Sequence, residues 1–366
     1  MNGTPNNGDD STRAILSSNS SYFVPSAPPF RARLAFAITV GVLAAAYVLA
    51  LAHFNTDFVS DFDQIWAGAR FLLDGEDPYR KVGLRGAFLW KWPLYYPVPA
   101  LLVVSPLASL SVVWARAVFV GLGTGLLAFG ITRDGWHRWP IFICIPFLIS
   151  VELAQWAPLY TAAFFLPWVG VFAIAKPNFG LALAAAARTN RALAWIIGGS
   201  LVLVAASFIV SPGWIPDWLE RVRSAQHFRA PVTRPLGFLL LLALLKWRRN
   251  DARFLLVFSC VPTAPSLYDP LMLFIVCESY KESLALTAST GVLFIVLFFL
   301  IGLQVPAPTY KAWGAVTGNW TVVCCYLTAL AIVLRKPNTG EFPAWITRFL
   351  PAVRRIDPSP RPQLHR

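Results

Sequence analysis

The sequence predicts an all-α fold: a polytopic bundle of transmembrane helices with one amphipathic surface helix in the first loop. Of the 366 residues, 57% are hydrophobic and only 13% are charged, whereas soluble domains are about half apolar and about a quarter charged. The mean hydropathy is +0.58. Apolar runs recur along the chain, enough for about nine to twelve membrane segments at about 20 residues for each full span.

The net charge of +13 has an explanation in membrane topology, so nucleic-acid binding is not expected. Lys and Arg gather beside apolar runs, as the positive-inside rule predicts for cytoplasmic loops. These clusters are Arg31 with Arg33, Arg188 with Arg191, residues 246–249, and Arg335 with Lys336. The five cysteines lie in apolar segments without a CxxC pair, which is typical of small buried hydrophobic residues. The four scattered histidines indicate no metal site.

The chain divides into one membrane domain and two tails. Residues 1–30 are rich in Asn, Ser, Gly and Pro and are expected to form a disordered cytoplasmic tail. Residues 31–336 form the integral membrane domain, and 337–366 a second cytoplasmic tail. Arg31 and Arg33 hold the N-terminus inside, and Arg335 and Lys336 do the same for the C-terminus. We expect a plasma-membrane protein, of a bacterium, whose first loop begins outside at His53.

The first loop contains six of the chain's eighteen acids, between residues 56 and 79. Its apolar residues follow helical spacing: Phe62, Ile65, Trp66, Ala69, Leu72 and Leu73. Ser60 and Asp63 resemble a capping box, and Gly75 suits the position that ends a helix. At ~14 residues the helix is too short to span a bilayer. It is expected to lie on the membrane surface with its apolar face down.

The remaining apolar segments vary in length, and several are shorter than a full span. They are 98–111, 112–131, 139–153, 157–175, 192–210, 236–245, 254–268, 270–277, 284–303 and 313–334. Short segments suggest re-entrant or broken helices, which are tolerated at membrane depth only beside protein or a water-filled cavity. The polar loop 211–235 is expected on the same side as the acidic loop. Arg133, His137 and Arg138 favour the inside, but counting 98–111 as a span places them outside. The sequence leaves open which short segment does not cross.

Asp61 is the strongest candidate for a catalytic base. It lies at the N-terminus of the predicted surface helix, where the helix dipole favours an ionised carboxylate that can accept a proton. The other acids of the loop have simpler interpretations. Asp63 caps the helix, and Asp74, Glu76 and Asp77 belong to its end and the following turn.

Charges within apolar surroundings form a second group of candidates: Glu152, Lys176, Asp269 and Glu278. Intramembrane ionisable residues usually face a cavity and serve a function. Lys176, next to Pro177, could hold a phosphate, or it could be a lysine whose amine reaches the membrane surface. Cations of the loop 211–235, among them Arg229, could bind phosphate or could be ordinary loop cations.

The pattern D-F-x-x-x-W-x-x-A-R-x-L-L-x-G-x-D-P-Y at residues 61–79 resembles the first-loop signature of glycosyltransferase family 87. Further matches, from about residue 33 to 335, are Tyr95-Tyr96-Pro97, Pro106-Leu107, Gln155, Lys176-Pro177 and Tyr268-Asp269. That family uses polyprenyl-phosphate sugars, includes mannosyltransferases and has the membrane-embedded C-type fold. The chain departs from the family pattern at Ala154, where Gly usually precedes the glutamine, and in a short spacing from Gln155 to Lys176.

The resemblance implies a hexosyltransferase in which Asp61 deprotonates the acceptor hydroxyl on the extracytoplasmic side. Mannose is the favoured sugar, and the acceptor would be lipid- or glycan-linked. Expected substrate-binding residues are Lys176, Tyr95, Tyr96, Gln155, Asn178, Arg229, Tyr268 and Asp269. No cofactor or metal is expected, because the donor carries its own leaving group, and no glycine-rich nucleotide loop is present.

Two other classes of function stay open on the sequence. A lipid or solute transporter could use Lys176, Glu152 and Asp269 as a translocation path, which predicts inverted repeats and acids near the membrane midplane. Here the acids gather in a loop and no repeat is visible. A non-catalytic membrane scaffold is the third hypothesis, under which the acidic loop could be replaced without effect.

Overall fold

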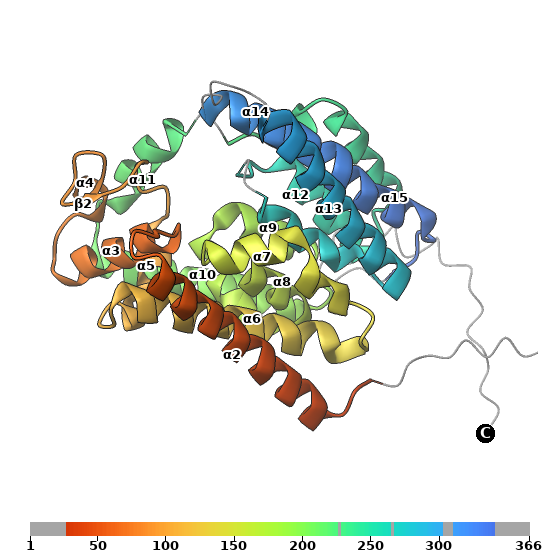
Figure 1. Ribbon diagram of the computed structural model, residues 1–366, viewed down its shortest axis with the longest axis horizontal. Helices are drawn as coiled ribbons and strands as arrows, with labels where there is room; N and C mark the ends of the chain where they lie inside the picture. The colour runs from red at the N-terminus through yellow and green to blue at the C-terminus, as the bar shows by residue number, and fades with distance from the viewer. Residues whose placement is uncertain (1–26, 226–227, 265–266, 303–309, 341–366) are drawn as a thin grey trace, which may run out of the picture.

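The computed structural model describes residues 27–225, 228–264, 267–302 and 310–340, which are mostly helical (Figure 1). The α-helices are α2 (Phe30–Phe54), α3 (Phe62–Leu73), α4 (Pro78–Lys81), α5 (Val98–Val104), α6 (Val112–Ile131), α7 (Ile145–Glu152), α8 (Ala157–Phe165), α9 (Pro177–Ala185), α10 (Asn190–Val210), α11 (Trp214–Arg223), α12 (Asn250–Cys260), α13 (Tyr280–Gly302), α14 (Tyr310–Thr321) and α15 (Leu327–Arg335). The expected tails lie outside the described residues, apart from 27–30 and 337–340.

Shorter elements connect these helices. The 3-10 segments are η1 (Ser105–Leu107), η2 (Thr132–Asp134), η3 (Trp139–Ile143), η4 (Pro167–Ala175), η5 (Pro231–Thr233), η6 (Gly237–Lys246) and η7 (Asp269–Val276). A π-helical segment, η8 (Val322–Tyr326), joins α14 to α15. Strands β1 (Val82–Gly83) and β2 (Phe88–Leu89) pair in parallel, with Val82 opposite Phe88.

Five of the described helices are long and apolar enough to cross a membrane, which confirms the predicted fold class. They are Phe30–Phe54, Val112–Asp134, Asn190–Val210, Tyr280–Leu300 and Gly314–Arg335. The other predicted membrane segments form helices too short to cross. Several begin with proline in their first turn, as α7, α8, α9 and η7 do. Proline cannot continue a preceding helix but suits a first turn, so these apolar stretches are divided into short pieces.

Helices α2 and α6 pack antiparallel through small residues. A Cβ atom added to Gly41 would lie 2.7 Å from the carbonyl oxygen of Gly121, and one added to Gly125 would lie 3.2 Å from that of Ala37. Membrane helices associate through such small residues because their backbones can then approach closely. The close contact between small residues therefore fixes the position of α2 on α6.

This pairing settles the side on which Arg133 lies. Nη2 of Arg33, at the start of α2, donates a 2.7 Å hydrogen bond to the carbonyl of Phe129, near the end of α6. Arg133 follows α6 directly, so it lies at the same end of the bundle as Arg33. Segment 98–111 is too short to count as a span: α5 has only seven residues and packs against α3.

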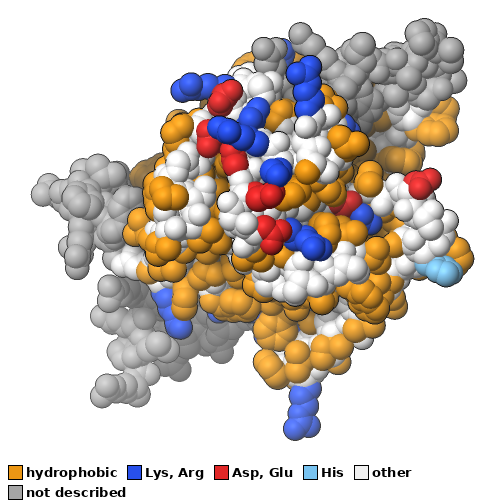
Figure 2. Space-filling view, turned by 90° about the vertical axis from the view of Figure 1, so that its left-hand side faces the viewer, with side chains coloured by type: hydrophobic (Ala, Val, Ile, Leu, Met, Phe, Trp, Pro, Cys, Tyr) orange, Lys and Arg blue, Asp and Glu red, His pale blue; other side chains and the backbone are white. Residues whose placement is uncertain are grey.

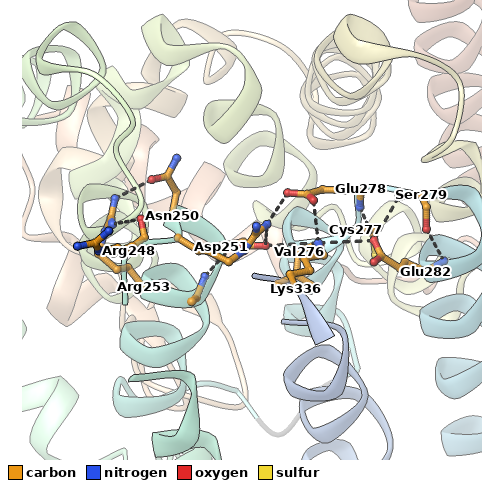
Figure 3. Close-up of polar contacts among 12 residues, drawn as sticks. Arg248, Asn250, Asp251, Arg253, Val276, Cys277, Glu278, Ser279, Glu282 and Lys336 are labelled. Carbon is orange, nitrogen blue, oxygen red and sulfur yellow. Dashed lines mark hydrogen bonds and ion pairs between the residues drawn. The ribbon is translucent and has the colours of Figure 1, made fainter. Parts of the chain in front are cut away.

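A charge network at this end joins the ends of four elements, α12, η7, α13 and α15 (Figure 3). Nζ of Lys336 lies 3.5 Å from Asp251, 3.4 Å from Glu278 and 3.6 Å from Glu282. Arg249 contacts Asp251 at 2.9 Å and Glu278 at 2.6 Å. Nε of Arg138, five residues after Arg133, donates a 2.7 Å hydrogen bond to the carbonyl of Cys277, so this network lies at the same end of the bundle as Arg133. We call this end the basic end. In Figure 1 α3, α4 and α11 lie at the opposite, left-hand side, which we call the site end.

Helix α3 has the predicted amphipathic pattern, but its apolar face packs against protein and not against lipid as predicted. Phe62, Ile65, Ala69 and Leu72 are almost fully buried within the protein. They pack in the core shared with α5 and α6 rather than facing lipid. The helix ends as predicted at Gly75, whose φ is +74°. Two backbone hydrogen bonds, from Gly75 and Glu76 to the last turn, form a Schellman motif.

Candidate active site

The site end contains an open cavity of about 690 Å³, within the usual size range of ligand sites. It is bounded by the start of α3, residues 89–97, the start of α9, α11, residues 262–264 and residues 267–268. Seven aromatic side chains line it together with a few polar groups: Trp90, Trp92, Tyr95, Tyr96, Trp218, Phe228 and Tyr268, with Asp61, Gln64, Lys91, Lys176 and Asn178. An apolar cavity with few converging polar groups is typical of a small-molecule site.

Asp61 directs its carboxylate toward this cavity instead of capping α3. It is the residue before the helix and makes no side-chain capping bond. Nε2 of Gln155 donates a 2.8 Å hydrogen bond to its Oδ2 atom. Nε2 of Gln64 donates to the backbone carbonyl of Asp61 at 3.2 Å. The carboxylate therefore keeps acceptor capacity for a ligand.

Burial raises the pKa of Asp61 above its ordinary value, while the nearby positive charges of Lys91 and Lys176 act in the opposite direction. The sequence suggested only the helix dipole, which favours ionisation. Removal from water outweighs these favourable charges, because burial disfavours a charged carboxylate. A raised pKa makes the carboxylate a stronger base than an exposed aspartate.

Asp63 holds the backbone that presents Asp61. Its two carboxylate oxygens accept 3.0 Å hydrogen bonds from the backbone N–H and hydroxyl of Ser60, so the predicted capping contact is present. The same carboxylate forms a buried, two-pronged ion pair with Arg116 of α6. The sequence interpretation missed Arg116, which lies inside an apolar run.

Gln155 reaches Asp61 because α7 ends in a sharp turn. Ala154 has a φ of +49°. The N–H groups of Ala154 and Gln155 donate to Val151 and Ser150 at 3.2 and 2.8 Å, again a Schellman motif. Glycine is favoured at this position, because other L-residues are strained there. The positive φ explains why glycine would be favoured at the position before Gln155, where this chain has Ala154.

Lys176 and Asp269 form an ion pair beside the cavity, with Nζ 3.2 Å from Oδ1. The other oxygen of Asp269 accepts a 2.8 Å hydrogen bond from the N–H of Ala264. The ammonium group also lies 3.9 Å from the ring centre of Phe179. Lys176 was predicted as a phosphate-binding charge, but Asp269 already balances much of that charge.

The loop 211–235 completes the aromatic wall. Nε1 of Trp218 in α11 donates a 2.9 Å hydrogen bond to the backbone carbonyl of Tyr95. The rings of Tyr95 and Phe228 pack edge to face, 5.5 Å between centroids. The hydroxyl of Tyr79 donates to the carbonyl of Tyr96 at 3.1 Å. Segments more than a hundred residues apart therefore form one continuous wall.

Six of the nine predicted site residues line this cavity: Asp61, Tyr95, Tyr96, Lys176, Asn178 and Tyr268. Gln155 and Asp269 do not line it but bond to Asp61 and Lys176, and Arg229 does not line it. Asn178 lines it, and its side-chain N–H donates to the carbonyl of Pro262 at 2.7 Å. Arg229 is exposed and takes part through its backbone, which accepts from the N–H of Thr263. Glu152 is half-buried and does not line the cavity. Of the three charges named for a transporter path, only Lys176 lines this cavity, and Asp269 pairs with it.

Lys91 is the main residue that the sequence interpretation missed. It lines the cavity and is exposed, and among the described residues it forms no ion pair. It lies in the segment 91–99, which was interpreted only as an aromatic belt. A signal was present, since Lys91 is the single charge within a run of aromatic and proline residues.

Glu76 and Asp77, two other acids of the first loop, form ion pairs at the surface of the site end. Glu76 pairs with Lys81 at 2.8 Å and Asp77 with Arg80 at 3.1 Å. Asp77 also caps α4 by accepting from the N–H of Tyr79. Figure 2 looks onto this end and shows acidic and basic side chains interspersed there.

No known protein family, curated protein or solved structure gives a significant match to this chain. The described residues contain no cluster of three His, Cys, Asp or Glu side chains suited to a metal ion. The site must therefore be interpreted from its own chemistry.

Proposed function

We propose that this chain is a membrane hexosyltransferase that uses a polyprenyl-phosphate sugar as donor. Asp61 is the general base, and the acceptor is a hydroxyl of a lipid- or glycan-linked sugar on the extracytoplasmic side. The observation that carries the proposal is the convergence of one partly buried carboxylate and two ammonium groups on a cavity with aromatic walls. The first-loop resemblance to glycosyltransferase family 87 adds support and makes mannose the favoured sugar.

The cavity chemistry suits the two parts of such a donor. Aromatic side chains offer broad apolar faces with polar edges, which fit the sugar ring and the first isoprenoid carbons. The ammonium groups of Lys91 and Lys176 suit the phosphate. Val59 and Asp61 of the cavity follow α2 closely, so under this proposal the donor head group binds just beyond the end of that candidate span.

The proposed reaction is a direct displacement. Asp61 takes the proton of the acceptor hydroxyl while the oxygen forms a bond to the anomeric carbon of the donor. The bond from that carbon to the phosphate oxygen breaks, and its electron pair stays on the released polyprenyl phosphate. A single displacement inverts the anomeric configuration.

Charge balance assigns different roles to the two lysines. Asp269 pairs with Lys176, so the two side chains together carry almost no net charge that could bind the phosphate. Protonation of Asp61 removes one negative charge while the leaving phosphate gains one. The positive charge of Lys91, which until then faces the Asp61 carboxylate, becomes available to the phosphate. We therefore assign Lys91 as the principal phosphate-binding cation.

The test is a transfer assay with purified protein and a panel of polyprenyl-phosphate sugars, comparing Asp61→Asn with the wild type. Loss of a general base should reduce turnover by about 10²–10⁴-fold. The matched control is Asp57→Asn, an exposed acid of the same loop, which should keep full activity. If folded Asp61→Asn retains near-full turnover on a confirmed donor, Asp61 is not the base. If the wild type transfers no sugar from any donor of the panel, the proposed function is wrong.

A further inference from the structure

A second cavity lies at the basic end, away from the proposed active site. It has a volume of about 210 Å³ and is bounded by the end of α6, the end of α8, and the loop from α9 into α10. Arg133 and Arg188 both line it, together with Thr189 at the start of α10. Helix α9 connects the two cavities: its first residues line the proposed active site, and Leu183 near its end lines the second cavity. The nine residues of α9 extend roughly 14 Å.

The cavity has an excess of positive charge. Asp134 also lines it, but this carboxylate lies 3.7 Å from the guanidinium of Arg138. Arg138 is almost completely buried, and its Nη1 atom has no hydrogen-bond partner within the described part of the chain. In that same part, neither Arg133 nor Arg188 forms an ion pair. Two arginines thus line the cavity with one carboxylate, and that carboxylate lies beside a third arginine, Arg138.

Both cavity arginines are held in place by contacts that leave their charge available. Nη1 of Arg133 donates to the carbonyl of Phe165 at 3.3 Å. The guanidinium of Arg188 lies 4.8 Å from the ring centre of Phe164. The N-terminus of α10, a 21-residue helix, adds the positive end of its dipole. A guanidinium fork and a helix N-terminus are both suited to phosphate oxygens.

The position of the cavity indicates where such a phosphate would come from. The cavity lies beside the ends of two candidate spans, since α6 ends at Ile131 and α10 begins at Asn190. Leu183, Pro167 and Ile196 form an apolar part of its wall. Basic pockets between membrane helices bind the head groups of anionic lipids, and the apolar wall suits the glycerol and first acyl carbons.

We propose that the cavity formed by Arg133, Arg188 and the start of α10 is a binding site for the phosphate group of an anionic membrane lipid. The site is independent of the transferase proposal, because it lies at the other end of the bundle and shares no residue with the first cavity. Its occupant joins α6, α8 and α10, so binding should stabilise the folded chain.

The test places the purified full-length protein in lipid nanodiscs of phosphatidylcholine with increasing phosphatidylglycerol. Thermal unfolding and native mass spectrometry report stabilisation and retained lipid. Phosphatidylglycerol should raise the Tm to a plateau, and Arg133→Gln/Arg188→Gln should bind it at least about tenfold more weakly, because two charge-assisted bonds are lost. The matched control is Arg191→Gln, an exposed neighbour that does not line the cavity and should bind normally.

Three results would overturn the proposal. An equal loss in Arg191→Gln would indicate diffuse attraction to a charged bilayer. Equal Tm values with and without phosphatidylglycerol would indicate no site. Protection by inorganic phosphate in pure phosphatidylcholine, with the same dependence on the two arginines, would indicate free phosphate instead of lipid. If the double variant does not fold, Arg188→Gln replaces it. Its side chain is exposed and lies over the ring of Phe164, so the variant should fold and still weaken retention of phosphatidylglycerol severalfold.

Discussion

Nε2 of Gln155 lies 2.8 Å from Oδ2 of Asp61 and donates a hydrogen bond to it. The two residues are 94 positions apart and come from different helix ends. The bond fixes one carboxylate oxygen and leaves the other for the acceptor hydroxyl. Gln155 therefore acts as a positioning residue for the proposed base.

Gln155→Leu should raise the pKa of Asp61, because the hydrogen bond that favours the charged form is lost. The acid limb of the kcat/KM profile should move up by about one pH unit, with a roughly tenfold loss of activity below it. A pH–rate profile of the transfer reaction measures the shift. A variant with lower activity but an unchanged acid limb would show that Gln155 acts only through packing.

Lys91→Met should also move the acid limb to higher pH. The charge of Lys91 lowers the pKa of Asp61, so its removal leaves the effect of burial less opposed. Fewer Asp61 side chains are then ionised at a given acidic pH, and the KM for the donor should rise. Lys91→Arg retains the charge and should restore the acid limb. An unaltered profile and KM in Lys91→Met would remove Lys91 from the site.

Asp63→Asn should destabilise the protein by about 3–5 kcal/mol, because Arg116 would be left as a buried charge without its partner. Both side chains are at most 4% exposed. Unfolding in detergent measures the loss, and Asp63→Leu/Arg116→Met should recover most of it. The surface pair provides the contrast: Asp77→Asn, opposite a largely exposed Arg80, should cost less than about 1 kcal/mol.

Gly41→Leu should prevent close packing of α2 on α6, since a Cβ atom at Gly41 meets backbone rather than a movable side chain. We expect a loss of about 1–3 kcal/mol, the usual cost of overpacking, or failure to fold. Gly198→Leu is the control, because a Cβ atom added there in α10 meets nothing within 4 Å. Similar Tm values for the two variants would mean that the α2–α6 contact does not depend on small residues.

Ala154→Gly should stabilise the folded chain by about 1 kcal/mol, because glycine adopts a φ of +49° without strain. Gln155 should keep its orientation, so transfer activity should not change. Ala205→Gly, at an exposed position within α10, should instead destabilise by about 1 kcal/mol. A loss of stability in Ala154→Gly would mean that the turn is not strained.

Local patterns predicted the local structure. The spacing of apolar residues located α3, and Gly75 marked its end, because both depend only on neighbouring residues. Some of the charges and prolines in apolar surroundings, Lys176 and Pro177 among them, line the same cavity as Asp61. Asp61, Lys176 and Tyr268 come from distant segments, yet all three line one cavity.

Partnerships across the chain could not be read in the same way. The pairing of Asp63 with Arg116 and that of Lys176 with Asp269 depend on helix packing, which periodicity does not specify. The surface on which α3 lies was predicted as lipid, because an amphipathic pattern reports an apolar neighbour without identifying it. The end of the bundle at which Arg133 lies could be assigned only from the hydrogen bond between Arg33 and Phe129.

The Lys176–Asp269 pair has a consequence for the biosynthesis of this protein. Asp61, Lys91, Gln155 and Lys176 all belong to the first half of the chain and enter the membrane first. Asp269 is synthesised 93 residues after Lys176, and chains begin to fold from the N-terminus as they are made. Until the later segment arrives, the ammonium group of Lys176 lacks its ion-pair partner Asp269. We therefore expect that the first half alone does not form an ordered site. A ribosome-bound chain that ends before Asp269 should bind membrane chaperones.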